Sequence, residues 1–393
     1  MIGGQFAPYP EKPAHFMKTA LYRLQQQRWE QHDNSQPVED HSATLVLCFA
    51  STQILNTPGT YQHIKAKFPS AHIAMCSTAG EIYQDDVLDD SLVAAAIHFE
   101  KTPIYSCTVN ITDYANTYTA AIALARKMPQ EGLKYILVLS DGSRVNGSEL
   151  VKGLATRVDK QVLITGGLAG DGANFQTTLV GLNEPPKEGE IAAIGFYGPH
   201  ITITHGSQGG WDIFGLEKRV TNASGNILVE LENQNSLDLY KKYLGPDSEK
   251  LPGSALLFPL SVIIPGTDKP VVRTILSINE EDKSMTFAGD IPVGSRVRFM
   301  KANFERLTHA AAVAAKFTAE NNRPDFSLLI SCVGRKLVLG DKTNEEVKAV
   351  SRTFNHKTVL AGFYSYGEIS PFNNGGRCQL HNQTMTITSF YEN

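Results

Sequence analysis

The sequence lacks the segments that would carry it out of the cytoplasm. Between Met1 and Gln36 no cationic stretch leads into an apolar run with a small-residue cleavage site, and no apolar run of about 18 residues occurs anywhere. The five cysteines stand far apart and are odd in number, which indicates reduced thiols rather than a disulfide framework. We therefore expect a soluble, cytoplasmic protein without membrane contacts.

The sequence also lacks an excess of positive charge. Its 36 basic residues are outnumbered by 40 acidic ones, and no local cluster of Lys and Arg offsets the formal net charge of -4. Such a chain has no electrostatic attraction for phosphate backbones or anionic membranes. We therefore do not expect nucleic acid or membrane as a partner.

Catalytic signatures are absent as well. The chain contains no HExxH, CxxC or GxSxG motif, and no His lies close to a Cys or Ser in a strong nucleophile–base signature. We therefore predict that the protein is not an enzyme. One catalytic alternative stays open, in which acids at the ends of strands act as acid–base groups.

One pattern is present three times along the chain. Each copy has an apolar strand, a helix, a second apolar strand ending in Gly and an acid, and a further strand. The acid follows the start of the first strand after 36, 35 and 40 residues, which indicates one duplicated unit. The strand starts and their acids are Leu45 and Glu81, Ile136 and Asp171, and Leu328 and Glu368.

The segments outside the repeats suggest how the 393 residues divide. The stretch from Ala14 to Asp33 has a loose helical stripe, and a polar linker follows it; after Gly210 a strand-rich stretch ends in an Ala-rich helix from about Lys301 to Asn321. We predict a mixed α/β fold with repeated strand–helix–strand units. Its parts are a helical leader and linker (1–42), an N-terminal domain with two units (43–210), and a C-terminal domain with a β-rich insertion and the third unit (211–393).

Clustered glycines after a strand are the strongest local signal for a ligand site. The run GGLAGDG at residues 166–172 lets the backbone approach a ligand, although close packing explains these glycines equally well. The three acids stand where α/β sheets place ligand crevices, and capping of turns is the alternative for them. The residues that we predict to bind a ligand are Gly167, Gly170, Asp171, Arg335, Tyr364, Tyr366, Glu368 and Asn382. In the third copy, Thr343 and Glu346 predict a capping box at the start of a helix.

Histidines become relevant if the ligand is haem, because a neutral imidazole nitrogen is the usual axial donor to its iron. The sequence has no CxxCH motif, so any haem b would be held without covalent bonds. A structural role is the alternative for every candidate, and no other metal is predicted. The candidate axial ligands are His381, His200, His205 and His356.

Several segments together resemble the FIST family, the F-box and intracellular signal transduction domains. They are GEI at residues 80–82, GGLAGDG, FGLEKRVTNASGN at residues 214–226, and GFYSYGEISP with LHNQTMTI at residues 362–387. The resemblance runs from about Ala43 to Tyr391 and implies a sensory protein with paired N- and C-terminal parts. Family members are proposed to bind small molecules such as amino acids and to work with histidine kinases, cyclic-di-GMP enzymes or chemoreceptors. A free-standing subgroup binds haem and responds to nitric oxide.

Three functions are open at this point. The first is a haem-dependent nitric oxide sensor that regulates a partner histidine kinase or diguanylate cyclase. The second is a module that binds an amino acid or other metabolite, with the predicted polar and aromatic residues as anchors in an apolar cleft. The third is the acid–base enzyme. Because the resemblance occupies nearly the whole chain, we expect the signal to pass to another polypeptide.

Overall fold

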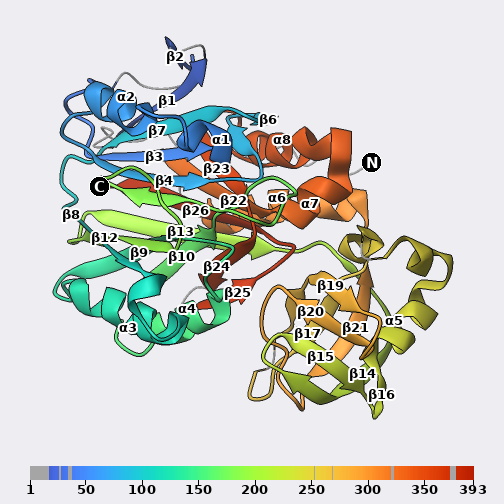
Figure 1. Ribbon diagram of the computed structural model, residues 1–393. Coiled ribbons are helices and arrows are strands. Elements are labelled where there is room, and N and C mark those ends of the chain that lie inside the picture. Colours follow the sequence, from blue (N-terminus) through green and yellow to red (C-terminus); the bar gives the residue numbers. More distant parts are fainter. Residues whose placement is uncertain are drawn as a thin grey trace.

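The computed structural model describes residues 17–25, 28–33, 38–251, 253–267, 269–319, 323–371 and 378–393. Three six-stranded sheets and one separate eight-stranded sheet make up the molecule (Figure 1). This confirms the predicted mixed α/β fold. No helix within these ranges combines the length and the apolar character needed to cross a membrane.

Each of the three six-stranded sheets is built around one copy of the repeated pattern. Two inner strands run parallel, the last strand of the copy pairs antiparallel with the first, and an outer strand pairs antiparallel with that one. In chain order from the outer strand these are β1 (Lys18–Gln25), β3 (Leu45–Ala50), β4 (His72–Ser77) and β7 (Leu92–His98); β8 (Ile104–Asn110), β9 (Leu133–Ser140), β10 (Leu163–Leu168) and β12 (Glu190–Tyr197); and β13 (Ile201–Gln208), β22 (Phe326–Cys332), β23 (Val359–Ser365) and β26 (Met385–Glu392).

The strands that follow each Gly and acid leave their own sheet and complete another one. Strands β5 (Glu81–Tyr83) and β6 (Asp86–Leu88) of the first copy extend the third sheet at β23. Strand β11 (Val180–Leu182) of the second copy pairs with β4 of the first. Strands β24 (Gly367–Pro371) and β25 (Cys378–His381) of the third copy extend the second sheet at β10. The three copies are therefore interlocked in a cycle.

The core lies between these sheets and draws side chains from all three copies. Phe49 and Phe363 stack at 5.0 Å between ring centres, and Tyr135 belongs to the same buried cluster. Strands such as β22 and β23 are buried along their whole length, which explains why they appear in the sequence as continuous apolar runs. Packing around one shared centre brings the three glycine-marked chain reversals close to one another.

Helices cover the outward faces of the three sheets (Figure 1). In α6, Asn303 caps the N-terminus, and one stripe of Leu and Ala is buried, as expected for an amphipathic surface helix. This helix matches the predicted Ala-rich segment. The helices of the three copies are α1 (Thr52–Leu55) and α2 (Thr60–Lys67); α3 (Thr117–Lys127) and α4 (Gly147–Leu154); and α6 (Phe304–Thr318), α7 (Val333–Leu339) and α8 (Thr343–Thr353).

The predicted β-rich insertion forms a separate body at the lower right of Figure 1. It has its own buried core, lies between β13 and α6, and carries one α-helix, α5 (Ser236–Leu244). β13 precedes the predicted domain boundary at residue 210 and pairs with β26, which follows it, so the third sheet includes strands from both sides of that boundary. The domain boundaries stay a prediction. The strands of the insertion are β14 (Asp212–Ser224), β15 (Ile227–Leu231), β16 (Gln234–Asn235), β17 (Leu260–Ile263), β18 (Val271–Arg273), β19 (Ile275–Asn279), β20 (Ser284–Phe287) and β21 (Arg296–Lys301).

The prediction of a helical leader is wrong. Residues 18–25 form β1 and residues 28–31 form β2 (Arg28–Gln31), and β1 pairs with β7 from Lys18 to Leu24. Ala20, Leu21 and Tyr22 are all buried, a pattern that a strand covered on both faces can accommodate and that a helix with one buried stripe cannot. The start of the predicted helix, from Ala14 to Phe16, and residues 34–37 of the predicted linker lie outside the described residues.

Candidate functional site

A pocket of about 380 Å³ lies where the second copy of the repeat, the β24–β25 hairpin and the insertion meet. This volume is at the small end of the range that is usual for ligand pockets. The loop of residues 142–147 before α4 forms one wall. The other lining residues are Leu168, Phe175, Asn226, Leu276, Phe287, Ala288, Gly289, Tyr366 and Leu380.

The loop of residues 142–147 is held in place by Asp141, which is fully buried. The backbone N–H groups of Ser143 and Arg144 donate to one oxygen of this carboxylate at 2.7 and 2.8 Å, and the N–H of Gly189 donates to the other at 2.7 Å. The Thr178 hydroxyl donates a further hydrogen bond at 2.8 Å. A buried carboxylate with this many donors forms a rigid turn, and the turn presents Arg144 to the pocket.

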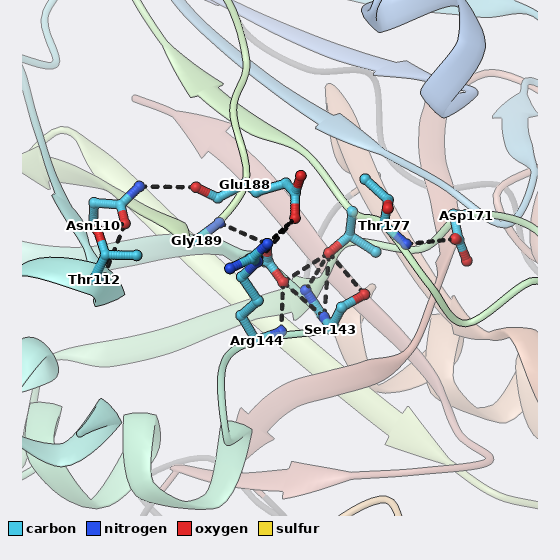
Figure 2. Close-up of polar contacts among 11 residues, drawn as sticks. Asn110, Thr112, Ser143, Arg144, Asp171, Thr177, Glu188 and Gly189 are labelled. Atoms are coloured by element: carbon cyan, nitrogen blue, oxygen red, sulfur yellow. Dashed lines mark hydrogen bonds and ion pairs between the residues drawn. The ribbon is translucent and has the colours of Figure 1, made fainter. Parts of the chain in front are cut away.

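Among the described residues that line the pocket, Arg144 has the one charged side chain. Its guanidinium Nε donates to Glu188 at 2.9 Å, and Figure 2 shows the two side chains side by side. Both are well exposed, at 51% and 41%. Exposed ion pairs of this kind contribute at most about 1 kcal/mol, so the guanidinium can turn to a carboxylate of a ligand at little cost.

Asp171 shapes the pocket without lining it. Its carboxylate accepts hydrogen bonds from the N–H groups of Phe175, Gln176 and Thr177 at 2.8, 2.9 and 2.8 Å (Figure 2 shows the bond to Thr177). The Tyr366 hydroxyl donates to the same carboxylate. Asp171 belongs to the glycine run that gave the strongest sequence signal for a ligand site. Its carboxylate contributes to the site by fixing the loop that follows this run.

That loop places an aromatic pair on the pocket wall. The ring of Phe175 stacks on the ring of Tyr366 at 4.6 Å between centres and 20° between planes. Phe175 has φ 55°, a left-handed conformation that bulky residues rarely adopt. Of the residues predicted to bind a ligand, Tyr366 is the one that lines the pocket.

The two predicted glycines serve close packing, which was the alternative explanation for them. A Cβ at Gly167 would lie 2.8 Å from Cγ2 of Ile330, and a Cβ at Gly170 would lie 2.9 Å from the backbone N of Ala79. Real Cβ atoms do not approach neighbours so closely. Each glycine therefore lets one copy of the repeat pack against another.

Glu368 is fully buried and ties β24 to the start of β26. The Ser365 hydroxyl donates to one carboxyl oxygen at 2.8 Å, while the N–H and the hydroxyl of Thr384 donate to the other at 3.1 and 2.8 Å. Burial raises the pKa of this carboxyl from 4.5 to about 8.

Glu81 repeats this arrangement in the first copy. The Thr78 hydroxyl, three residues before it, donates to one oxygen, and the N–H and hydroxyl of Ser91 donate to the other at 3.2 and 2.7 Å. Burial raises its pKa to about 7. In the second copy Leu168 stands three residues before Asp171, so no hydroxyl is available there and the acid binds loop N–H groups instead. In all three copies the contacts of the acid are those of turn capping.

Arg335 and Tyr364 form a buried network with Glu346, and none of the three lines the pocket. The Arg335 guanidinium donates to Glu346 at 2.7 Å and to the carbonyl of Leu307 at 2.9 Å, and the Tyr364 hydroxyl donates to Glu346 at 2.6 Å. The predicted capping box at Thr343 is absent because Glu346 turns into this network instead. Asn382 is also buried outside the lining, and its side-chain N and O have no hydrogen-bond partner among the described residues.

None of the four candidate histidines is among the described residues that line the pocket. The buried pair, His381 and His205, point Nε2 at backbone carbonyls of β24 at 2.9 and 3.1 Å. A ring nitrogen facing a carbonyl carries the proton, so the lone pair of each neutral ring is on Nδ1. Burial lowers the pKa of His381 to about 4 and so keeps its ring neutral. His200 and His356 are exposed and use Nδ1 in local hydrogen bonds to Asn393 and Ser351.

Arg144 and Phe175 are the site residues that sequence reasoning missed. Neither belongs to a recognised motif, and Phe175 is three residues beyond the glycine run. A signal was nevertheless present, because Asp141 and Asp171 both follow apolar strands and begin polar loops. The residues that those loops present were better candidates than the acids themselves.

Comparison with known families assigns almost the whole chain. The FIST N domain matches residues 44–234, and the FIST C domain matches residues 236–371. No curated protein matches the chain.

Two solved structures of cyanuric acid hydrolase are similar to this chain. One, from A. caulinodans, has 8% sequence identity and a TM-score of 0.33, and the similarity covers 96% of this chain and 99% of that one. The other, described as an evolutionary innovation by structural concatenation, has 8% identity and a TM-score of 0.31 over 96% and 100% of the two chains. Because both are enzymes, the prediction that this chain is not an enzyme is contradicted and no longer stands. At these TM-scores the likeness assigns no activity to this chain.

Proposed function

The chain belongs to the FIST family of signal-transduction sensory domains, and from this premise we propose that it senses a small metabolite of the amino-acid type in the pocket beside Arg144. The observation that carries the proposal is the pocket itself, which is lined by three separate parts of the chain. Family membership supports the sensory role, and the pocket supplies a place for the ligand.

Arg144 lines the pocket and is paired with the exposed Glu188, which is not among the lining residues; this pair suits a zwitterion. Arg144 offers N–H donors to a carboxylate, and Glu188 at 2.9 Å from it offers an acceptor to an ammonium group. Around this pair the walls are mainly apolar and aromatic, as in most small-molecule sites. An amino acid presents both charges at one end and a side chain at the other.

The position of the pocket offers a route from binding to signal. Residues of the insertion and residues of the interlocked core both line it, so a bound ligand would contact both bodies at once. A ligand shifts a conformational equilibrium only if it binds one state more tightly than the other. A ligand that bridges the two bodies meets this condition when their separation differs between states.

We also propose which kind of protein receives the signal. A histidine kinase or a diguanylate cyclase is the recipient to test, because such proteins are the partners that membership of this family implies. The test is co-purification of the full chain with each candidate in the presence and absence of ligand.

We expect Arg144→Gln to weaken ligand binding about tenfold or more, because a charge-assisted hydrogen bond to the carboxylate is lost. Thermal-shift screening of the standard amino acids would find the ligand, and isothermal titration calorimetry would measure its Kd. Arg157→Gln is the matched control, since Arg157 is exposed and does not line the pocket. Equal affinities of the two variants would place the ligand elsewhere.

Haem remains the alternative ligand, as a nitric oxide sensor, without support from the positions of the four candidate histidines. We expect hemin titration to give no histidine-dependent Soret band. Absorption spectra of the wild-type chain and of the His381→Ala and His205→Ala variants provide the measurement. A Soret band that shifts with nitric oxide and disappears in either variant would restore the haem hypothesis.

A further inference from the structure

We propose that the ligand carries a planar ring as well as a carboxylate, and that Phe175 selects it by stacking on that ring. This inference rests on the proposed function, because it names the class of molecule that the same pocket takes. Aromatic amino acids and aryl carboxylates without an ammonium group share the chemistry.

Phe175 leaves a large aromatic surface open at the pocket. Its side chain is 44% exposed although Tyr366 stacks on it at 4.6 Å. A ring that is supported by a second ring and still open to a pocket is arranged for offset stacking with a third.

The backbone conformation and hydrogen bonds of Phe175 indicate that the loop holds its ring at the pocket wall. Its φ of 55° is unfavourable for a bulky residue, and its N–H is fixed by Asp171 at 2.8 Å and by the Tyr366 hydroxyl at 3.0 Å. If the ring only covered the core, no such conformation would be needed, because it is largely outside the core. The polar anchors instead keep it at the pocket wall.

The remaining walls suit a flat molecule with one charged end. Leu168, Leu276 and Leu380 are apolar, and Gly289 has no side chain that would project into the pocket. A Cβ at Gly289 would lie 3.2 Å from Cδ2 of Leu380, which marks how closely the wall is packed. Arg144 then provides the charge for the carboxylate.

The test compares one pair of ligands that differ in the saturation of the ring with two further ligands that each lack one feature. Phenylalanine and cyclohexylalanine have rings of the same size, and only the first is planar; 3-phenylpropionate lacks the ammonium group, and leucine lacks a ring. Calorimetry on the full chain should give phenylalanine an affinity about three- to tenfold above that of cyclohexylalanine. Binding of 3-phenylpropionate decides between an aryl carboxylate and an amino acid, and binding of either supports the inference.

The variants test whether Phe175 is responsible. In Phe175→Leu the preference for phenylalanine over cyclohexylalanine should disappear, whereas Phe317→Leu should keep it. Phe317 is the matched control, because it is also 44% exposed and lies on α6 outside the pocket lining. Tyr366→Phe keeps the supporting ring but removes the hydroxyl that holds the Phe175 backbone, so it should reduce the preference about threefold.

Two results would overturn the inference. One is equal affinity of wild-type protein for the planar and the saturated ring, or a preference that survives Phe175→Leu. The other is that leucine or a different metabolite binds in an Arg144-dependent manner while no ring-bearing carboxylate does; the proposed function would then stand without this inference. If no molecule in the wider amino-acid screen binds, both fail together.

Discussion

Arg335→Leu is expected to lower the free energy of unfolding by about 3–5 kcal/mol, because it leaves the carboxylate of Glu346 buried without its cationic partner. Both side chains are completely buried, and their ion pair measures 2.7 Å. The guanidinium also donates to the carbonyls of Gly209 and Leu307, which stand where the chain leaves the core for the insertion and returns from it. Urea unfolding followed by circular dichroism measures the loss.

A matched exposed ion pair provides the control for this prediction. Arg296 lies 3.5 Å from Glu217, with side chains 54% and 33% exposed, so Arg296→Leu should change stability by less than about 1 kcal/mol. The double variant Arg335→Leu with Glu346→Leu should regain part of the loss, since no unpaired charge remains. If Arg335→Leu were as mild as Arg296→Leu, the network would contribute nothing to stability.

The repeated architecture could be predicted from the sequence because it depends on local patterns. Buried strands such as β3 and β22 are continuous apolar runs, and the acids Glu81, Asp171 and Glu368 mark the same point in each copy. The sequence does not indicate which sheet each of the exchanged strands joins. β5, β11 and β24 are short, and their exchange between sheets is decided by packing around a shared core that no single copy displays.

The leader shows how tertiary pairing overrides a local pattern. Leu21 and Leu24 have helical spacing, but Leu21 pairs with Ala95 and Leu24 with Leu92 in a ladder along β7. Hydrogen bonds to an available strand edge outweigh a weak helical stripe. Tertiary contacts also decide the positions of Arg335 and Tyr364, two residues predicted to bind a ligand, because both hydrogen-bond to Glu346 inside the fold and neither lines the pocket.

The contribution of Glu368 to the stability of the wild-type protein should fall as pH rises from about 5 to 9, and Glu368→Gln should remove that contribution. His381, whose folded pKa is lowered to about 4, acts in the opposite direction between about pH 4 and 6.5 and is unchanged in the variant. The folded pKa of Glu368 is about 8 against an ordinary value of 4.5, so its stabilisation is complete below about pH 4.5 and is lost as pH rises through 8. Between pH 5 and 9 this corresponds to a loss on the order of 4 kcal/mol. Glu81, with a pKa of about 7, adds to the slope in the same direction and remains in the variant.

The partners of Glu368 explain why the cradle tolerates both protonation states. Ser365 and Thr384 contribute hydroxyl groups, which can donate to a carboxylate or accept from a carboxylic acid, and glutamine can replace the acid with similar geometry. Urea unfolding at pH 5, 7 and 9 compares the wild type, Glu368→Gln and the exposed control Glu345→Gln. The control should keep the wild-type slope. If Glu368→Gln kept it as well, the carboxyl would be ionised throughout this range, and its two hydroxyl partners would have to be compensating its burial fully.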